Sequence, residues 1–176
     1  MPDVDAIVVP VGGAGLIAGI ALAVKTLRPE VAIYGVEPER AASYRAALAN
    51  NGPVMLQDMG STLADGLAVP CVGANAFSVS KDYVDHCVEV QEKSIALSVL
   101  RLVENEKIVV EGSGATGLAG IIEAFAPWGE EKPKYVRSRD ITLYYCIWCS
   151  LGTFARKEAS LFSSGLHLVS SAVFFF

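Results

Sequence analysis

A continuous apolar strand that runs directly into a glycine turn limits the folds open to this chain more than any other feature. Residues 6–11 are apolar and mostly β-branched, a pattern typical of a strand buried on both faces of a parallel sheet. Gly12-Gly13-Ala14-Gly15 follows at once, and residues 16–25 have the apolar character of a buried helix. A second strand is predicted over residues 32–36. This order predicts a βαβ unit, whose ligands gather at the carboxyl ends of the strands.

Predicted helices and strands alternate along the chain as far as residue 125, which indicates an α/β fold. Apolar residues are spaced as in helices at residues 39–50, 94–104 and 118–125. Alternating character predicts a strand at residues 84–90, and a short run containing Ile108, Val109 and Val110 predicts another at residues 107–111. A loop over residues 62–67, with Asp65-Gly66 at its centre, and a glycine turn over residues 112–117 complete the pattern.

Composition and charge exclude several classes of protein. The 176 residues are 52% hydrophobic and 19% charged, which suits a domain with a sizeable core rather than a disordered chain. The formal charge of −5, without a basic cluster, argues against a nucleic-acid partner. Four scattered cysteines do not make a secreted disulfide scaffold, and the first residues are acidic where a signal peptide would be basic. We expect a cytoplasmic protein with no membrane span.

The composition changes near residue 137 and divides the chain into two predicted parts. Residues 137–176 hold 8 of the 15 aromatic residues but only 2 of the 16 glycines. Residues 1–136 contain 10 Lys plus Arg against 17 Asp plus Glu, hence a formal charge of −7. We therefore expect a glycine-rich, acidic domain over residues 1–136 and an atypical tail over residues 137–176 that is poorly ordered or misplaced.

Isolated cysteines and histidines are not interpreted as sites. Cys146 and Cys149 have C-x-x-C spacing, but no second pair and no neighbouring histidine accompany them, so a zinc or redox role is not predicted. His86 and His167 have no visible partner, and we expect both to be structural.

The first glycine turn has the chemistry of a phosphate site. Without side chains the backbone comes close to an anion, and the helix that follows adds positive potential at its amino end. A tight turn that needs glycine only for packing is the alternative. The run at residues 12–15 is neither G-x-G-x-x-G nor a P-loop, so a plain nucleotide-binding domain is disfavoured.

Four segments, in the order that one family requires, resemble the serine racemase and threonine/serine ammonia-lyase family. They are residues 4–20, 35–38 (Gly-Val-Glu-Pro), 61–67 and 108–115. Members of this family are pyridoxal-phosphate enzymes of fold type II, similar to tryptophan synthase β. The resemblance implies a partial parallel sheet from the large, cofactor-binding domain of such an enzyme.

The resemblance also assigns cofactor contacts. The residues that it places around the cofactor phosphate are Gly12, Gly13, Ala14, Gly15 and Leu16. Ala14 stands where the family usually has glycine, and a methyl group there is expected to require a negative φ. Asp65-Gly66 would approach the cofactor ring. Glu111, which ends a predicted strand, would lie near the ring or the substrate. The alternatives are an ordinary turn at Asp65-Gly66 and a solvated carboxylate at Glu111.

The resemblance also implies a divalent-cation site, but only some of its ligands are present in this sequence. Glu37 matches a carboxylate ligand of serine racemase-like members, and Ala41 would offer its carbonyl oxygen. Ser43 stands where those members have an acid, so Mg²⁺ or Ca²⁺ would be held weakly. The alternative is that Glu37 is a surface or helix-capping acid.

The activity implied is β-elimination from L-serine or L-threonine, which yields a 2-oxo acid and ammonia. Racemisation of serine is the neighbouring outcome, because both reactions begin with loss of the α-proton. The family is typically homodimeric, so a third hypothesis is a non-catalytic, truncated partner of a full-length subunit. Co-purification with that subunit would distinguish a partner from an inert fragment.

The lysine chemistry of the family generates a testable prediction. Its Schiff-base lysine lies in a Ser-x-Lys-x-Arg-Gly context, which none of the seven lysines of this chain has. We expect the pure 176-residue chain, supplied with pyridoxal phosphate and L-serine or L-threonine, to yield no 2-oxo acid. Pyruvate or 2-oxobutyrate above the level of a protein-free blank would contradict this expectation.

Overall fold

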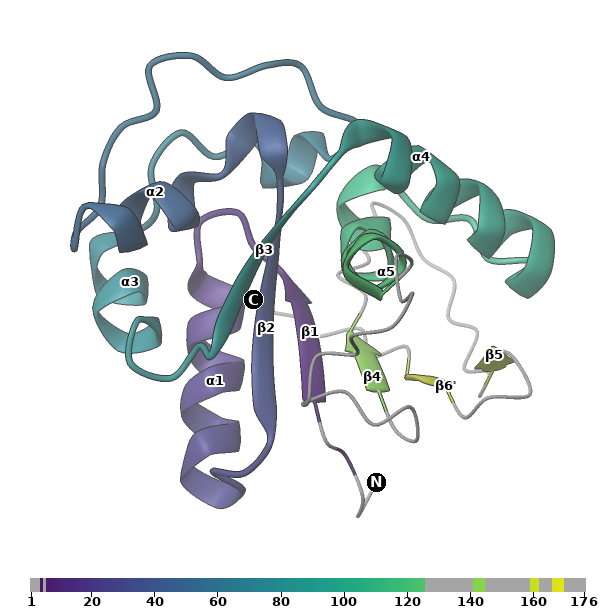
Figure 1. Ribbon diagram of the computed structural model, residues 1–176, viewed down its shortest axis with the longest axis horizontal. Coiled ribbons are helices and arrows are strands. Elements are labelled where there is room, and N and C mark those ends of the chain that lie inside the picture. The colour runs from purple at the N-terminus through teal and green to yellow at the C-terminus, as the bar shows by residue number, and fades with distance from the viewer. Residues whose placement is uncertain (1–3, 5, 126–140, 145–158, 162–165, 170–176) are drawn as a thin grey trace, which may run out of the picture.

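A single six-stranded sheet organises the fold (Figure 1). The computed structural model describes residues 4, 6–125, 141–144, 159–161 and 166–169. The strands are β1 (Ala6–Pro10), β2 (Ala32–Pro38), β3 (His86–Val90), β4 (Ile141–Tyr144), β5 (Ala159–Leu161) and β6 (Leu166–Val169). Their order is β3-β2-β1-β4-β6-β5, and neighbours are parallel except β5 and β6. The α/β fold with a parallel sheet is therefore confirmed.

Helices cover both faces of this sheet. They are α1 (Gly15–Leu27), α2 (Ser43–Ala49), α3 (Ala74–Ser80), α4 (Glu92–Arg101) and α5 (Gly112–Phe125). Figure 1 shows α1, α2 and α3 on one side of the strands and α4 and α5 on the other. Within the described ranges, no helix combines the length and hydropathy that crossing a bilayer requires.

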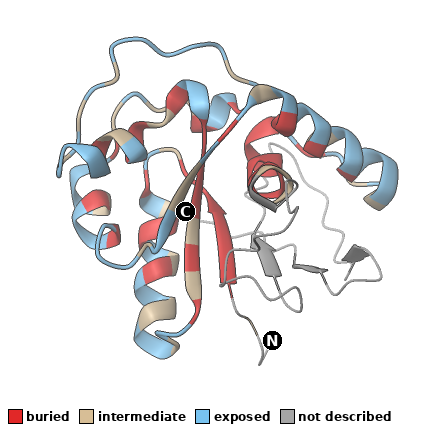
Figure 2. Cartoon of the chain, viewed as in Figure 1, coloured by how far each residue is buried: buried red, intermediate tan, exposed pale blue. Residues whose placement is uncertain are grey.

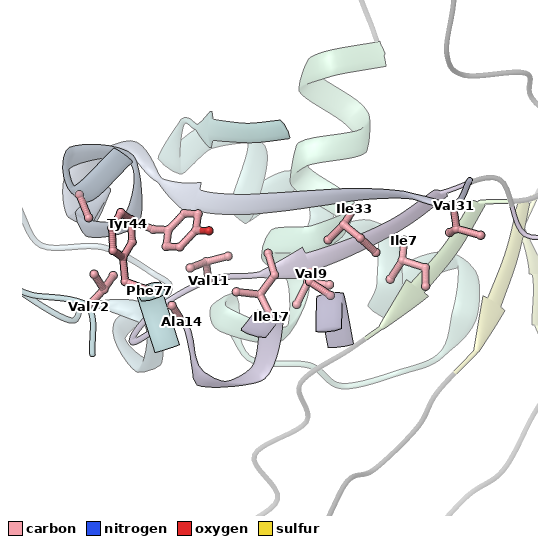
Figure 3. Close-up of a cluster of buried hydrophobic side chains, with 12 residues drawn as sticks. Ile7, Val9, Val11, Ala14, Ile17, Val31, Ile33, Tyr44, Val72 and Phe77 are labelled. Atoms are coloured by element: carbon pink, nitrogen blue, oxygen red, sulfur yellow. The ribbon is translucent and has the colours of Figure 1, made fainter. Parts of the chain in front are cut away.

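The central strand β1 is buried along its whole length, as its apolar run predicts (Figure 2). Val8 belongs to the apolar cluster beneath α5, which includes Val36 and Leu118. Val9 belongs to the cluster on the opposite face, where Ile17 of α1 packs (Figure 3). Successive side chains of a strand point to opposite faces, so one short strand joins two cores.

The strand order reverses at β1, and this places the glycine turn. From β1 the chain passes to β2 and then β3 on one side, whereas β4 pairs with β1 on the other. In open α/β sheets, ligands bind outside the carboxyl ends of the strands at such a switch point. The turn after β1 therefore stands where this architecture forms its sites.

Several predicted elements differ from the structure. The strand expected at residues 107–111 is wrong: the chain leaves a π-helical turn (Leu102–Glu106) at Lys107, whose φ is 57°, and Ile108 donates its N–H to the Leu102 carbonyl. This bond to the preceding turn takes the place of strand pairing. The glycines at residues 112–117 do not form a separate turn but begin α5.

Two helical regions also depart from expectation. The helix expected at residues 39–50 is divided into a 3-10 turn (Glu39–Ala41) and α2, because Ala42 has a non-helical ψ of 63°. Helix α3 was not predicted at all. It is short, and Phe77 and Ser80 are its buried residues, so its sequence carries little periodic signal.

The approach of α5 to β2 depends on glycine and yields a prediction. A Cβ at Gly120 would lie 2.7 Å from Val36 Cγ2, whereas a Cβ at Gly19, in α1, would meet nothing within 4 Å. Gly120→Ala is expected to lower the free energy of unfolding by about 1–3 kcal/mol through overpacking. Gly19→Ala is expected to raise it by up to about 1 kcal/mol, because alanine favours helix. Urea unfolding followed by circular dichroism measures both, and equal effects would contradict this account.

Candidate functional site

The glycine turn after β1 is held in place by backbone hydrogen bonds. Val11 donates its N–H to the Val36 carbonyl at 2.9 Å, which extends the pairing of β1 with β2. The Gly13 carbonyl accepts from the Gly73 N–H at 3.2 Å, next to the start of α3. Two neighbouring elements thus fix the turn before the chain enters α1.

The amino end of α1 has no side chain to cap it. The first N–H groups of a helix have no partner within the helix, and Ala14, at the N-cap, makes no side-chain bond to them. Gly13 and Gly15 are exposed, and a Cβ at Gly15 would meet nothing within 4 Å. Uncapped donors, positive helix potential and open space suit an anion such as a phosphate group.

Ala14 holds a conformation that glycine usually adopts. Its φ is 68° and its ψ is 0°, in the left-handed region, so the expectation of a negative φ is wrong. Its methyl group is buried in the cluster shown in Figure 3, which includes Val72 and Phe77. A left-handed alanine costs about 1–2 kcal/mol, and the packing of the methyl group offsets part of that cost.

A second segment, residues 61–67, lies against the first turn and contains a 3-10 turn (Asp65–Leu67). A Cβ at Gly12 would lie 3.2 Å from the Leu67 Cα and 3.3 Å from a Val69 methyl group. The absence of a side chain at Gly12 therefore lets the two backbones touch. Sequence reasoning linked neither Leu67 nor Val69 to the turn, because nothing local signals the contact.

The same segment also lies against the start of α5. A Cβ at Gly66 would lie 2.8 Å from the Ser113 Oγ and 3.8 Å from a carboxylate oxygen of Glu111. A Cβ at Gly112 would collide with the Leu63 carbonyl oxygen. The structure thus brings together three of the four motifs, from residues 12–16, 61–67 and 111–113.

Two exposed carboxyl groups and one buried hydroxyl group lie at this junction. Burial raises the pKa of Glu111, and the nearby Asp65 carboxylate raises it further. The Asp65 carboxylate accepts the Gly66 N–H at 2.9 Å. Ser113 is buried, and its hydroxyl has no hydrogen-bond partner within the described part of the chain. A free hydroxyl beside an acid with a raised pKa is typical of a site that receives a polar ligand.

Glu37, from the remaining motif, has a different role in the structure. It is fully buried, and its two carboxylate oxygens accept the N–H groups of Tyr44 at 2.7 Å and Arg45 at 2.8 Å. The Cys87 thiol donates to the second oxygen at 3.4 Å, and burial raises the pKa of that thiol. Glu37 therefore caps α2 from inside, as the helix-capping alternative had it.

The metal prediction gains no support from these contacts. Ala41 and Ser43 are both buried beside Glu37, and the Ser43 hydroxyl has no partner among the described residues. No group of three or more His, Cys, Asp and Glu side chains in those residues is arranged to hold a metal ion. Mg²⁺ and Ca²⁺ need several oxygen ligands, whereas the contacts that the structure shows for Glu37 are hydrogen bonds from backbone N–H groups and from the Cys87 thiol.

The isolated histidines and cysteines are only partly described. His86 stacks on Tyr34, with ring centroids 4.6 Å apart, on strand β3 at one edge of the sheet. His167 contributes backbone to β6. Cys146 and Cys149 lie outside the described residues, as does the predicted boundary at residue 136, so the division into domain and tail stays a prediction.

Comparison with known proteins agrees with this geometry. Residues 1–136 match the family described as pyridoxal-phosphate dependent enzyme. The chain is 44% identical over 122 residues to the L-threonine ammonia-lyase of Thermotoga maritima, a match that covers 69% of the chain. The chain spans only 30% of that relative's length.

Solved structures show the same similarity. A threonine deaminase from T.th. matches with a TM-score of 0.68 and 34% identity, over 73% of this chain and 47% of that one. Maize serine racemase matches with a TM-score of 0.65 and 36% identity, over 68% of this chain and 37% of that one.

The buried carboxyl of Glu37 predicts a specific pH dependence. Burial raises its pKa from 4.5 to about 7, although the hydrogen bonds to it act in the opposite direction. Between these values the folded state binds a proton that the unfolded state lacks, so stability falls as the pH rises. Titration of this group lowers the free energy of unfolding by up to about 1.4 kcal/mol for each unit of increase in pH.

Replacing Glu37 tests this assignment. Glu37→Gln keeps one side-chain acceptor but cannot titrate. In this variant the free energy of unfolding is expected to fall with a smaller slope between about pH 4.5 and 7 than it does in the unmodified chain. Glu39→Gln, an exposed residue two positions on, serves as the control and should leave the slope unchanged. Chemical denaturation at several pH values measures the slope, and an unaltered slope in Glu37→Gln would refute the assignment.

Proposed function

The chain belongs to the pyridoxal-phosphate-dependent enzyme family, and we propose that it forms part of an L-threonine or L-serine ammonia-lyase. The reaction removes the α-proton and the β-hydroxyl group of the amino acid as water. Hydrolysis of the resulting imine then breaks the α-carbon to nitrogen bond and yields a 2-oxo acid and ammonia. One observation carries the proposal: three segments that are distant in sequence meet where the strand order reverses. The L-threonine ammonia-lyase similarity supports this choice of reaction.

The residues of the first turn suit the cofactor phosphate. Gly12, Gly13, Ala14, Gly15 and Leu16 form the end of the turn and the uncapped start of α1. Their N–H groups would bind the phosphate, and the positive end of α1 would stabilise its charge. Although Ala14 carries a methyl group, it keeps the left-handed conformation and turns that group into the core. The backbone conformation that glycine usually adopts is therefore kept at this position.

The residues at the start of α5 suit the polar edge of the same ligand. Pyridoxal phosphate, when bound, withdraws electrons from the substrate α-carbon and so eases loss of the α-proton. Gly66 and Leu67 would form one wall beside the ring. The Ser113 hydroxyl and the Glu111 carboxyl would meet its polar groups or those of the substrate. Because burial and Asp65 both raise the pKa of Glu111, that carboxyl can hold a proton above the usual range of a glutamate.

The lysine that would bind the cofactor covalently and move the α-proton has no counterpart among the family motifs of this chain. In this proposal it is supplied by sequence that the curated relative has and this chain does not match, since the match covers 30% of that relative. Cytoplasmic location and a homodimer remain predictions. A divalent cation is not part of the proposal, because the described residues hold no group of three or more His, Cys, Asp and Glu side chains arranged for a metal ion.

A second candidate activity is racemisation of serine, favoured by 36% identity to maize serine racemase. The two activities share the cofactor and the loss of the α-proton. They differ in their products, so one assay distinguishes them. The longest form of the protein that its transcript encodes should convert L-threonine to 2-oxobutyrate. Formation of D-serine from L-serine, without 2-oxo acid, would favour the racemase.

The phosphate cradle can be tested on the 176-residue chain itself. Gly15→Asp places a carboxylate in the first turn of α1, which favours the helix but repels an anion. We expect this variant to keep or raise the free energy of unfolding and to bind pyridoxal phosphate and inorganic phosphate at least about tenfold more weakly. Equilibrium dialysis measures the affinities.

Gly19→Asp makes the same change one turn further along α1, where a Cβ also has open space, and should retain binding. Equal loss of binding in both variants would mean that net charge, rather than the cradle, controls affinity. Absence of pyridoxal phosphate binding by the unmodified chain would overturn the assignment of the cradle.

A further inference from the structure

The segment at residues 61–67 separates the two glycine-rich parts of the site, so its position sets the distance between them. Leu67 packs on Gly12 of the first turn, and Gly66 packs on Ser113 of α5. The Leu63 carbonyl lies against Gly112, at the start of α5. Much of this segment has irregular backbone, so side chains from outside it must hold it in place.

Glu92 supplies one of these side chains. It is the first residue of α4, and its Oε2 accepts the Leu63 N–H at 2.8 Å. Its other oxygen, Oε1, is buried and has no hydrogen-bond partner within the described ranges. A carboxylate oxygen that is buried without a partner is costly, so its presence needs an explanation beyond the stability of α4.

Arg40 supplies the second side chain that holds residues 61–67. It lies in the 3-10 turn after β2, and its Nη1 donates to the Ser61 carbonyl at 2.6 Å. The Gly60 N–H donates to the Arg40 carbonyl at 3.3 Å, and a Cβ at Gly60 would lie 2.9 Å from the Arg40 Cδ. The aliphatic part of the Arg40 side chain therefore occupies the space where a Cβ at Gly60 would lie. The chain is thus held at residues 60–61 by Arg40 and at Leu63 by Glu92.

We infer that Glu92, assisted by Arg40, is a positioning residue for the site, which fixes residues 61–67 between the two glycine-rich parts. The identity of the ligand rests on the proposed function, but the positioning itself does not. Glu92 acts through the backbone of Leu63, whose carbonyl meets Gly112 while Gly66, three residues on, covers Ser113. Loss of the bond at Leu63 would loosen both contacts together.

The experiment compares Glu92→Ala and Glu92→Gln in the 176-residue chain, with Glu104→Ala as the control. Glu104 is exposed in the π-helical turn that follows α4. Hydrogen exchange without cofactor reports the mobility of residues 61–67, and equilibrium dialysis reports the dissociation constant for pyridoxal phosphate. Glu92→Ala should speed exchange in that segment and raise the dissociation constant roughly fivefold, the worth of one hydrogen bond.

Glu92→Gln can still accept the Leu63 N–H through its amide oxygen, so it should restore slow exchange and most of the affinity. If Glu92→Gln behaves as Glu92→Ala does, the charge at the start of α4 is what acts, and the inference is overturned. Unchanged exchange at residues 61–67 in Glu92→Ala also overturns it. Because exchange is measured without cofactor, it judges the inference even if the unmodified chain fails to bind pyridoxal phosphate, a result that would count against the proposed function.

Arg40→Met provides a second variant if Glu92→Ala does not fold. Methionine keeps much of the apolar stem but loses the bond to the Ser61 carbonyl. Faster exchange at residues 61–67, with weaker binding of pyridoxal phosphate, would support the inference. Exchange and binding equal to those of the unmodified chain would overturn it.

Discussion

Burial of β1 on both faces is the constraint on which the rest of this structure depends. Ile7 and Val9 belong to one core and Val8 to the other, so the strand cannot slip along its neighbours without exposing apolar groups on one face and burying mismatched ones on the other. The end of β1 is therefore fixed in space. The uncapped start of α1 follows from that position, because the chain has only the residues 11–14 in which to turn. The packing of the core thus fixes the position of the proposed phosphate site.

Glycines shape the site by letting backbones touch. Gly12 meets Leu67, Gly66 meets Ser113, and Gly112 meets the Leu63 carbonyl. Each contact would be lost or strained if a Cβ were added. Ala14 is the exception, since it accepts a left-handed conformation and places its methyl group in the core. The close packing that brings the motifs together also leaves little freedom to change them.

The sequence predicts part of the fold and part of the candidate site, and physical reasons explain why it does not predict the rest. The strand at β1 and the glycine turn follow from local pattern, and the resemblance places Gly66 and Glu111 near the same ligand, which agrees with their proximity in the structure. The conformation of Ala14 depends on neighbours that are distant in sequence, such as Phe77, and so does the contact of the Cys87 thiol with the buried Glu37 carboxyl. The tether from Glu92 to Leu63 joins residues 29 positions apart, and no local pattern signals such a bond. The strand predicted at residues 107–111 is wrong for the opposite reason: its composition suits a strand, but no neighbouring strand in the described part of the chain is there to pair with it.

The separation in sequence between the parts of the site has a consequence for how the chain folds. The first turn and the start of α5 are about a hundred residues apart, and residues 61–67 lie near the middle of that interval. Contacts between such distant segments require closure of a long loop, whose entropy is lost before the contacts are gained. Local elements such as α1 can form early, whereas the junction of Gly12, Gly66 and Ser113 needs nearly the whole described chain. We therefore expect the proposed binding site to be completed late in folding, when the native topology is in place.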